Sequence, residues 1–577
     1  MKQLRSFSIL LLLISLFLAA APLDNRTYAA WRDPVRGKHA MVASQHELAS
    51  QIGTDVMKKG GNAVDAAIAV ALALAVVYPE AGNLGGGGFM LIRLKDGTTT
   101  AIDYREMAPK LATRDVYLNE KGELIRGEGS STVGYRASGV PGTPAGMDYA
   151  FKKYGSGKIK WSELVEPARK LAQDGYVLSY RLANLFKAYE SSLSKYEDSK
   201  KIFLNGGKLF EEGDVLKQPD LAATLSRMQK TGVKDFYEGT TAKLIADDMK
   251  RNNGLIRLED LKAYQVKERV PIRGNYRGYE IISMPPPSSG GIVLIQVLNM
   301  LESRDVSKMA WASAEKYHLL TESLRRAFAD RAEFMGDPDF ANVPAERLVS
   351  KEYALERMKS IDADKASDSK TIGHGEPIGK ESMDTTHFTV VDPEGSVVTN
   401  TYTINDLYGS SVTAKGTVAL LNDEMDDFAA QPGKANMFGL IQGENNSVQP
   451  GKRPLSSMTP TIVLRKDGSL WFALGARGGP RIITAVLQST INMIDHGMNI
   501  QEAIDAPRIH HQWFPDHIYF EPFGLTPDTR NILEKMGHRF NGSAGNLASA
   551  TGIAIEETTG VRLGAIDSRS DGEAIGY

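Results

Sequence analysis

The sequence predicts a protein of the mixed α/β (α+β) class, on three observations. Amphipathic segments of helical period dominate the first half of the chain. Shortly after residue 384 the apolar residues change to the period of two that strands have. The chain has 577 residues, of which 42% are hydrophobic and 24% charged, so it can bury a large core in one or more domains.

The first thirty residues have the pattern of a secretory signal peptide. Two basic residues precede an apolar stretch that ends at Ala21, and small residues suitable for cleavage occur there and again at Ala29 and Ala30. The sequence leaves both cleavage points open. We therefore expect residues 1–30 to be removed and the remaining chain to be exported, to the periplasm or the medium, with no membrane attachment.

Composition excludes several classes of partner and site. A formal net charge of −2, with no blocks of basic residues, gives no general attraction for nucleic acid or anionic membranes and favours a small or zwitterionic partner. The absence of cysteine excludes disulfides, thiolate metal sites and a cysteine nucleophile. The ten histidines include no HExxH motif and no cluster at ligand spacing, so we expect no metal, and we expect His510 and His511 to pack beside Trp513.

Helices account for most of the first half. An alanine-rich run over residues 66–77 is too short to cross a membrane and predicts a buried helix with Asn62 as its N-cap. Ser44, with Glu47 three residues later, marks the expected start of the helix before it. Further amphipathic helices are predicted at residues 161–173, 218–230, 240–251 and 313–334.

A β-hairpin is predicted at residues 387–405. HFTVV and SVVTNTYTIN flank the turn DPEG, in which Pro393 and Gly395 suit a four-residue loop. Pairing across that loop places Thr385 beside residue 402 or, with one bulge, beside Thr403. The many threonines have two interpretations: strand propensity on a half-exposed face, or a nucleophile among them.

The segment before this hairpin, residues 360–382, is polar and poor in apolar residues, so we expect it to be exposed and mobile. Such a segment running directly into a buried strand fits a chain that is cut at the junction. A long surface loop is the simpler explanation of the composition alone.

The sequence gives little support for the common catalytic and phosphate-binding motifs. There is no GxSxG motif, and Ser456 and Ser457 have no neighbouring base in the sequence. The glycine run at residues 82–88 leads into the strand-like FMLIRL rather than into GK[ST], so it indicates close backbone approach and not a phosphate loop.

Two segments could bind anions, although each alone is more often structural. Gly478 and Gly479 precede Pro480 at an expected first helical position, where free N–H groups would face an anion or oxyanion. Arg105 follows an expected strand end and could pair with a carboxylate.

Several segments together resemble one family, gamma-glutamyltranspeptidase, which is also called glutathione hydrolase. In chain order they are GNLGGGGFM, IDYREMAP, PPPSSGG, DTTHFTVVD, TYTIN, LLNDEMDDF, KRPLSSMTPTIV, GGPRIITAVLQ and APRIHHQW. The resemblance runs from about residue 35 to Tyr577. It implies a four-layer αββα sandwich of the N-terminal-nucleophile hydrolase type, built jointly by two subunits from one precursor, with no cofactor.

The resemblance also implies self-cleavage between Asp384 and Thr385. Residues 31–384 would then form the large subunit and residues 385–577 the small catalytic subunit of a heterodimer. The α-amine released by the cut would serve as the base for the Thr385 hydroxyl, since its pKa lies near neutrality. The implied substrates are glutathione and other γ-glutamyl compounds, with water, an amino acid or a dipeptide as acceptor.

Roles for ten residues follow from the same resemblance. Thr385 would be the nucleophile, and Thr403 would orient it. The oxyanion donors would be Gly478 and Gly479. The α-carboxylate of the donor would be held by Arg105, Ser456 and Ser457, and its α-ammonium by Asn405, Glu424 and Asp427.

The sequence departs from the family at two positions. Glu424 stands where some relatives have glutamine, which adds negative charge near the ammonium. Phe438 stands where several bacterial members have a tyrosine in a lid loop. We expect a lid without that hydroxyl to open more readily, which would shift the balance between hydrolysis and transfer; product ratios of wild type and Phe438→Tyr test this.

Two other functions stay open from the sequence. A related N-terminal-nucleophile amidase, such as a cephalosporin (glutaryl) acylase, would share Thr385 but would not need Asn405 and Asp427. An exported amino-acid-binding protein could use Arg105 and Asp427 but would not need Thr385, and it would remain one band on a denaturing gel.

Overall fold

The computed structural model describes residues 32–372, 385–417, 419–437 and 439–577. The expected signal peptide lies outside these residues. All the elements below belong to the unit Pro34–Tyr577. No described helix combines the length and the hydropathy that crossing a bilayer requires.

Two seven-stranded sheets form the centre of this unit, and every strand pair within them is antiparallel. The first sheet has the order β20 (Glu573–Gly576), β2 (Met41–Ser44), β10 (Thr386–Val391), β11 (Val397–Thr403), β3 (Gly87–Arg93), β4 (Thr99–Asp103) and β7 (Lys267–Arg269). The second has the order β1 (Val35–Gly37), β19 (Arg562–Ile566), β18 (Ser549–Ile555), β15 (Leu470–Arg477), β14 (Thr461–Leu464), β9 (Tyr279–Ser283) and β8 (Ile272–Tyr276).

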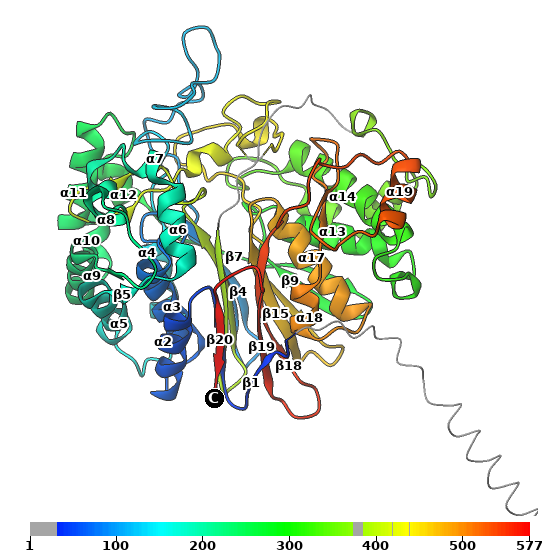
Figure 1. Cartoon of the computed structure of the whole chain (residues 1–577), viewed down its shortest axis with the longest axis horizontal. Coiled ribbons are helices and arrows are strands. Elements are labelled where there is room, and N and C mark those ends of the chain that lie inside the picture. The colour runs from blue at the N-terminus through cyan, green and yellow to red at the C-terminus, as the bar shows by residue number, and fades with distance from the viewer. Residues whose placement is uncertain (1–31, 373–384, 418, 438) are drawn as a thin grey trace, which may run out of the picture. The chain divides into compact units, whose positions relative to one another are not determined.

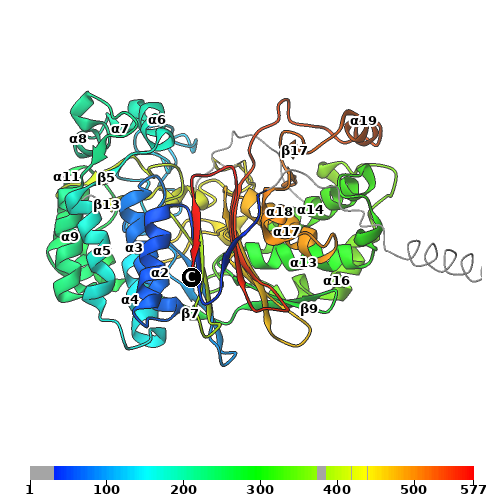
Figure 2. The same ribbon diagram turned by 60° about the horizontal axis from the view of Figure 1, so that its bottom comes forward.

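The two sheets pack face to face, with β10 and β11 against β15, and helices cover both outer faces (Figures 1 and 2). On the first sheet lie α2 (Glu47–Lys58) and α3 (Ala63–Val77), with α5 (Trp161–Asp174) packed on α3 and α9 (Pro219–Thr231) on α5. On the second lie α13 (Gly290–Glu302) and α17 (Arg481–Ile494), with α14 (Ala314–Phe334) and α16 (Lys351–Met358) packed on α13. These are the four αββα layers that the resemblance implies.

The remaining helices extend these two outer layers. On the side of the first sheet they are α4 (Thr143–Tyr154), α6 (Tyr180–Ala188), α7 (Glu190–Leu193), α8 (Glu197–Phe203), α10 (Lys234–Glu238), α11 (Thr240–Arg251) and α12 (Leu258–Ala263). On the side of the second they are α15 (Ala345–Leu348), α18 (Ile500–Asp505) and α19 (Pro527–Lys535). The expected helices at 161–173, 218–230, 240–251 and 313–334 are confirmed to within one residue at each end.

Helix α3 is buried along its whole length, as its alanine-rich sequence predicts. The Asn62 side chain accepts hydrogen bonds from the N–H groups of Val64 and Asp65, at 3.1 and 3.0 Å, and so caps the helix. The expected start of α2 is wrong: His46 is its N-cap, and Ser44 is the last residue of β2.

The β10–β11 hairpin has a longer loop than the sequence indicates. The ladder runs from Val391 opposite Val397 to Thr386 opposite Tyr402, so residues 392–396 form a five-residue connection. The Asp392 carboxylate closes this connection by accepting from the Ser396 N–H at 2.8 Å. The register therefore places Thr385 opposite Thr403 without the bulge that a four-residue loop would need.

The glycine run allows β3 to approach β11 closely, as expected. A Cβ added at Gly86 would lie 1.9 Å from the Thr403 carbonyl oxygen, and one added at Gly88 would lie 2.4 Å from that of Thr401. Because no side chain fits there, glycine is required for the strand that carries Thr403 to be held at this depth.

The polar segment before the hairpin is only partly as expected. Ser369 is fully buried, and the Ser367 N–H donates to the Glu322 carboxylate at 3.1 Å. Most of residues 360–372 are exposed, as predicted, and Ser369 is the exception because its side chain accepts from the buried Arg325 of α14. The rest of the segment lies outside the described residues.

Candidate active site

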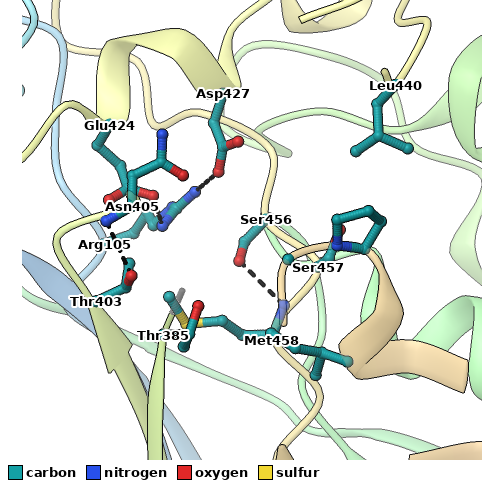
Figure 3. A pocket seen from close by; sticks show the side chains of 13 residues that line it. Arg105, Thr385, Thr403, Asn405, Glu424, Asp427, Leu440, Ser456, Ser457 and Met458 are labelled. Atoms are coloured by element: carbon teal, nitrogen blue, oxygen red, sulfur yellow. Dashed lines mark hydrogen bonds and ion pairs between the residues drawn. The ribbon is translucent and has the colours of Figure 1, made fainter. Parts of the chain in front are cut away.

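One pocket brings together residues from both sides of the expected cut (Figure 3). The empty space in this pocket, including space open to solvent, is about 300 Å³. Nine of the ten residues with implied roles line it. The lining residues are Arg105, Thr385, Thr403, Asn405, Glu424, Asp427, Leu440, Ser456, Ser457, Met458, Gly479, Pro480 and Ile482.

Thr385 and Thr403 occupy the ends of paired strands at this pocket. Thr385 immediately precedes β10 and is only 4% exposed, while Thr403 is the last residue of β11. The Thr403 Oγ1 accepts a hydrogen bond from the Asn405 N–H at 2.9 Å, and its own hydrogen is not used in that bond. Asn405 has a φ of 78°, a left-handed conformation that asparagine tolerates better than most non-glycine residues.

Arg105 is buried in the pocket and paired with acids. Its Nη1 donates to Glu424 and its Nη2 to Asp427 (Figure 3). Its backbone is held on both sides, since its N–H donates to Asp103 at 3.0 Å and its carbonyl accepts from the Tyr264 hydroxyl at 2.9 Å. The guanidinium therefore has a fixed position at the pocket wall.

Acidic groups outnumber Arg105 at this wall. Glu106, which is fully buried, lies 3.6 Å from Arg105 in addition to Glu424 and Asp427. Burial raises the pKa of Glu106 to about 7, and it raises the pKa values of Glu424 and Asp427 while Arg105 opposes that rise. Burial works to lower the pKa of Arg105, but its acidic neighbours raise it overall. A site with this excess of carboxylate favours a ligand that brings a cation.

The opposite wall of the pocket consists of serines. The Ser456 Oγ accepts from the Met458 N–H at 3.1 Å (Figure 3). The backbone of Ser456 is tied to the segment before α13, because its N–H donates to the Pro287 carbonyl and its carbonyl accepts from the Ser289 N–H, both at 2.8 Å. Ser457 follows on the same strand-like segment.

The two glycines before α17 divide between two hollows. Gly479 lines the pocket, whereas Gly478 lines a neighbouring hollow with Ala548 and Ser549. Their φ values of 134° and 54° are in the left-handed region, where glycine is favoured. Pro480 is the N-cap of α17 rather than its first residue, so the helix begins one residue later than expected.

Two of the residues singled out from the sequence, Asp384 and Phe438, lie outside the described residues. His510 and His511 are fully buried, and the His511 Nδ1 accepts from the Trp513 N–H at 3.2 Å, as their expected packing role requires.

One group of side chains of metal-ligand type was not predicted from the sequence. Ligand atoms of His318, Glu322 and His538 lie within 4.8 Å of one another. The two histidines share a hydrogen bond of 2.8 Å, and Glu322 accepts from Arg325 at 3.3 Å and Arg326 at 2.7 Å. Because two guanidinium groups already neutralise the carboxylate, the group does not fit a metal ion.

Sequence reasoning missed two residues that hold the site. The Asn83 side chain donates to the Thr403 carbonyl at 2.8 Å and accepts from the Gly86 N–H at 2.9 Å, which locks β11 to the glycine run. Arg331 on α14 donates to Ser457 Oγ at 3.4 Å. Asn83 stands inside the motif GNLGGGG and could have been noticed there; nothing in the sequence around Arg331 connects it to the serines.

The chain is similar to known proteins over most of its length. The family Gamma-glutamyltranspeptidase matches residues 49–577. The glutathione hydrolase proenzyme of Escherichia coli (strain K12) is 49% identical over 525 residues, 90% of each chain. That of Pseudomonas sp. (strain A14) is 46% identical over 516 residues, 89% of each. The acylase ACY 1 proenzyme of Pseudomonas sp. (strain SE83) is 37% identical over 548 residues, 94% of each.

Solved structures of proteins with such names have a similar fold. A cephalosporin acylase from Bacillus halodurans superposes with a TM-score of 0.83 at 26% identity, over 97% of this chain and 99% of the other. A Helicobacter pylori gamma-glutamyltranspeptidase chain gives a TM-score of 0.56 at 45% identity, over 60% of this chain and 96% of the other. The αββα sandwich of the N-terminal-nucleophile hydrolase type is thereby confirmed, and the chain belongs to the gamma-glutamyltranspeptidase family.

Proposed function

We propose that this chain is a self-cleaving gamma-glutamyltranspeptidase and glutathione hydrolase, on the family match and the composition of one pocket. The observation that carries the proposal is the buried Thr385 at the start of β10, in a pocket that also holds a guanidinium and two carboxylates. A threonine nucleophile and a site for a free amino-acid head group are the two parts that γ-glutamyl transfer requires.

The first step is cleavage of the chain before Thr385. The Thr385 Oγ attacks the carbonyl carbon of Asp384, the C–N bond breaks as the acyl group moves to oxygen, and water hydrolyses the resulting ester. The products are residues 31–384, extended to residue 30 or 22 if the signal peptide is cut after residue 29 or 21, and residues 385–577. A H. pylori chain that aligns over nearly all its own length with only 60% of this one supports such a division. The two subunits stay together as a heterodimer because both contribute strands to each of the two sheets.

The cut supplies the base for catalysis. An α-amine has a pKa of about 7.7 to 8.0, so roughly a tenth of it is free base at pH 7. It takes the proton of the Thr385 hydroxyl as Oγ attacks the γ-carbonyl, and Gly478 and Gly479 bind the oxyanion. The amine of the donor leaves with that proton, and water or an acceptor amine then takes the γ-glutamyl group from the acyl-enzyme. Amino acids and dipeptides are the proposed acceptors.

The head group of the donor replaces an ion pair already present in the pocket. Arg105 holds Glu424 and Asp427 without a ligand. An arriving γ-glutamyl head group brings one anion and one cation, so its carboxylate pairs with Arg105 while its ammonium pairs with Glu424, Asp427 and the Asn405 side chain. This exchange keeps Arg105 paired with an anion and gives the carboxylates a cation, which an ordinary peptide without a free head group could not do.

A glutaryl acylase is the second candidate, because an acylase proenzyme is 37% identical and a cephalosporin acylase shares the fold. A glutaryl group has the carboxylate but lacks the ammonium. The buried carboxylates Glu424 and Asp427 favour the γ-glutamyl donor.

The experiment compares γ-glutamyl-p-nitroanilide with glutaryl-p-nitroanilide as donors for the matured protein. The proposal expects kcat/KM to be at least about tenfold higher for the γ-glutamyl donor, the effect of one charge-assisted contact. A preference for the glutaryl donor would identify an acylase instead.

Export of the protein, to the periplasm or the medium, is also proposed, from the sequence pattern of residues 1–30.

A further inference from the structure

Arg331 is a buried arginine beside the serine wall of the pocket. It belongs to α14 and is 1% exposed. Its Nε donates to Ser289 Oγ at 2.9 Å and its Nη2 to Ser457 Oγ at 3.4 Å. Its Nη1 is buried and has no hydrogen-bond partner among the described residues.

Arg331 also lacks the carboxylate partner that other buried arginines have. Arg453 pairs with Asp103 at 2.7 Å and Arg508 with Asp567 at 2.8 Å. In the described part of the chain no acid lies within 4.0 Å of Arg331, and Asp427 acts on its charge from a greater distance. A buried guanidinium without a counter-ion is costly, and an anion arriving nearby would remove that cost.

The hydrogen bonds around Arg331 fix which way the serine hydroxyls face. A guanidinium can only donate, so Ser457 Oγ accepts from Arg331 and keeps its own hydrogen to donate elsewhere. Ser456 Oγ accepts from the Met458 N–H and likewise keeps its hydrogen. Both hydroxyls of the wall are thereby set as donors, which is the arrangement that a carboxylate needs.

Ser289 connects Arg331 to the backbone of the serine wall. It accepts from Arg331 Nε, and its hydroxyl donates to the Ser456 carbonyl at 2.7 Å. This residue comes from the PPPSSGG motif, which has no other role in the proposed reaction. One arginine therefore contacts one serine of the wall directly and fixes the backbone of the other through Ser289.

We propose that Arg331 is a positioning residue for the α-carboxylate of the donor: it sets the Ser457 hydroxyl as a donor, fixes Ser456 through Ser289, and supplies positive charge behind both. Arg105 contacts the carboxylate from one side, and Arg331 acts from the other through the serines. This inference rests on the proposed function, because it needs a donor with a free α-carboxylate.

The test separates a role toward the carboxylate from a purely structural one. Wild type, Arg331→Lys, Arg331→Met and Ser289→Ala are assayed with γ-glutamyl-p-nitroanilide and with 4-aminobutyryl-p-nitroanilide, which keeps the amine but lacks the α-carboxylate. For Arg331→Met we expect kcat/KM to fall about 10- to 100-fold with the γ-glutamyl donor, mainly through KM, and less than about threefold with the carboxylate-free donor. Arg331→Lys should recover part of the loss, because it keeps the charge.

Ser289→Ala keeps the inference testable if Arg331→Met fails to fold. It should show a smaller loss, about two- to tenfold, with the same dependence on the carboxylate. Equal losses with both donors, in either variant, would overturn the role of Arg331. Failure of the wild type to release p-nitroaniline from the γ-glutamyl donor would instead overturn the proposed function, so the two failures are distinguishable.

Discussion

Thr385 lies opposite Thr403 at the open end of the β10–β11 hairpin, because Thr386 pairs with Tyr402 in an unbroken antiparallel register. This pairing depends on the five-residue connection that Asp392 closes. It places the proposed nucleophile beside a hydroxyl that already accepts one hydrogen bond, from the Asn405 N–H. The hairpin therefore positions both threonines before any substrate is present.

Removing the Thr403 hydroxyl should impair the proposed nucleophile. We expect Thr403→Ala to lower kcat about 10- to 100-fold with little change in KM, because the orientation of Thr385 is lost while the head-group site is intact. Thr403→Ser is the matched control and should retain most of the activity. Steady-state kinetics with γ-glutamyl-p-nitroanilide measures both; a Thr403→Ala enzyme as active as wild type would contradict the role.

Replacing a carboxylate that pairs with Arg105 by an amide should have different effects at Asp427 and at Glu424. Asp427→Asn is expected to raise KM for γ-glutamyl donors about 10- to 100-fold, because a charge-assisted contact to the ammonium is lost. Glu424→Gln should change KM by less than about threefold, since Asp427 still supplies a carboxylate to the ammonium. The same assay with a glutaryl donor is the control, and Asp427→Asn should raise its KM far less.

The buried Glu106 should make stability depend on pH. Burial raises its pKa from 4.5 to about 7, so the folded protein favours the neutral carboxyl. Its contribution to the free energy of unfolding is therefore fully present below pH 4.5 and is lost as the pH rises through about 7. We expect Glu106→Gln to stabilise the protein by about 1–3 kcal/mol at pH 8.5 and to have little effect at pH 5. Thermal unfolding at the two pH values, with the exposed Glu120→Gln as control, measures this; an equal shift at both would be inconsistent with a buried ionisation.

The glycine run should tolerate no side chain where it meets β11. In Gly86→Ala the new Cβ would lie 1.9 Å from the Thr403 carbonyl oxygen, so either β3 or β11 must move. We expect destabilisation of more than about 3 kcal/mol and loss of maturation. Gly542→Ala is the control, because Gly542 is exposed and its added Cβ would meet nothing within 4 Å. Normal maturation of Gly86→Ala would show that the close approach is not needed.

The fold could be predicted from the sequence to the extent that each element has a local signal. Helix α3 carries its own cap at Asn62, and the hairpin carries alternation and a turn. The hairpin register could not be derived from the alternation, because the loop is one residue longer and is closed by a hydrogen bond that the Ser396 N–H donates to the Asp392 carboxylate. The four layers came from the family resemblance, since no local pattern shows which face of a sheet meets another sheet.

The site could be predicted where a role belongs to a motif and not where it comes from packing. Arg105 was singled out at an expected strand end, Asp427 and the serines were found by resemblance, and the structure places all of them around one pocket. The ion pairs of Arg105 with Glu424 and Asp427 join residues more than 300 positions apart and could not be seen in the sequence. Arg331 was missed for the same reason, because its partners Ser289 and Ser457 are distant in the chain.

The central claim is that this chain cuts itself before Thr385 and uses the new terminus for catalysis. N-terminal sequencing of the smaller fragment from purified wild type, beside Thr385→Ala, tests it most directly. We expect two bands for wild type, with the smaller beginning TTHFTVV, and one uncut chain for Thr385→Ala. A variant that still matures at the bond between residues 384 and 385, or a wild type whose small fragment begins elsewhere, would contradict it.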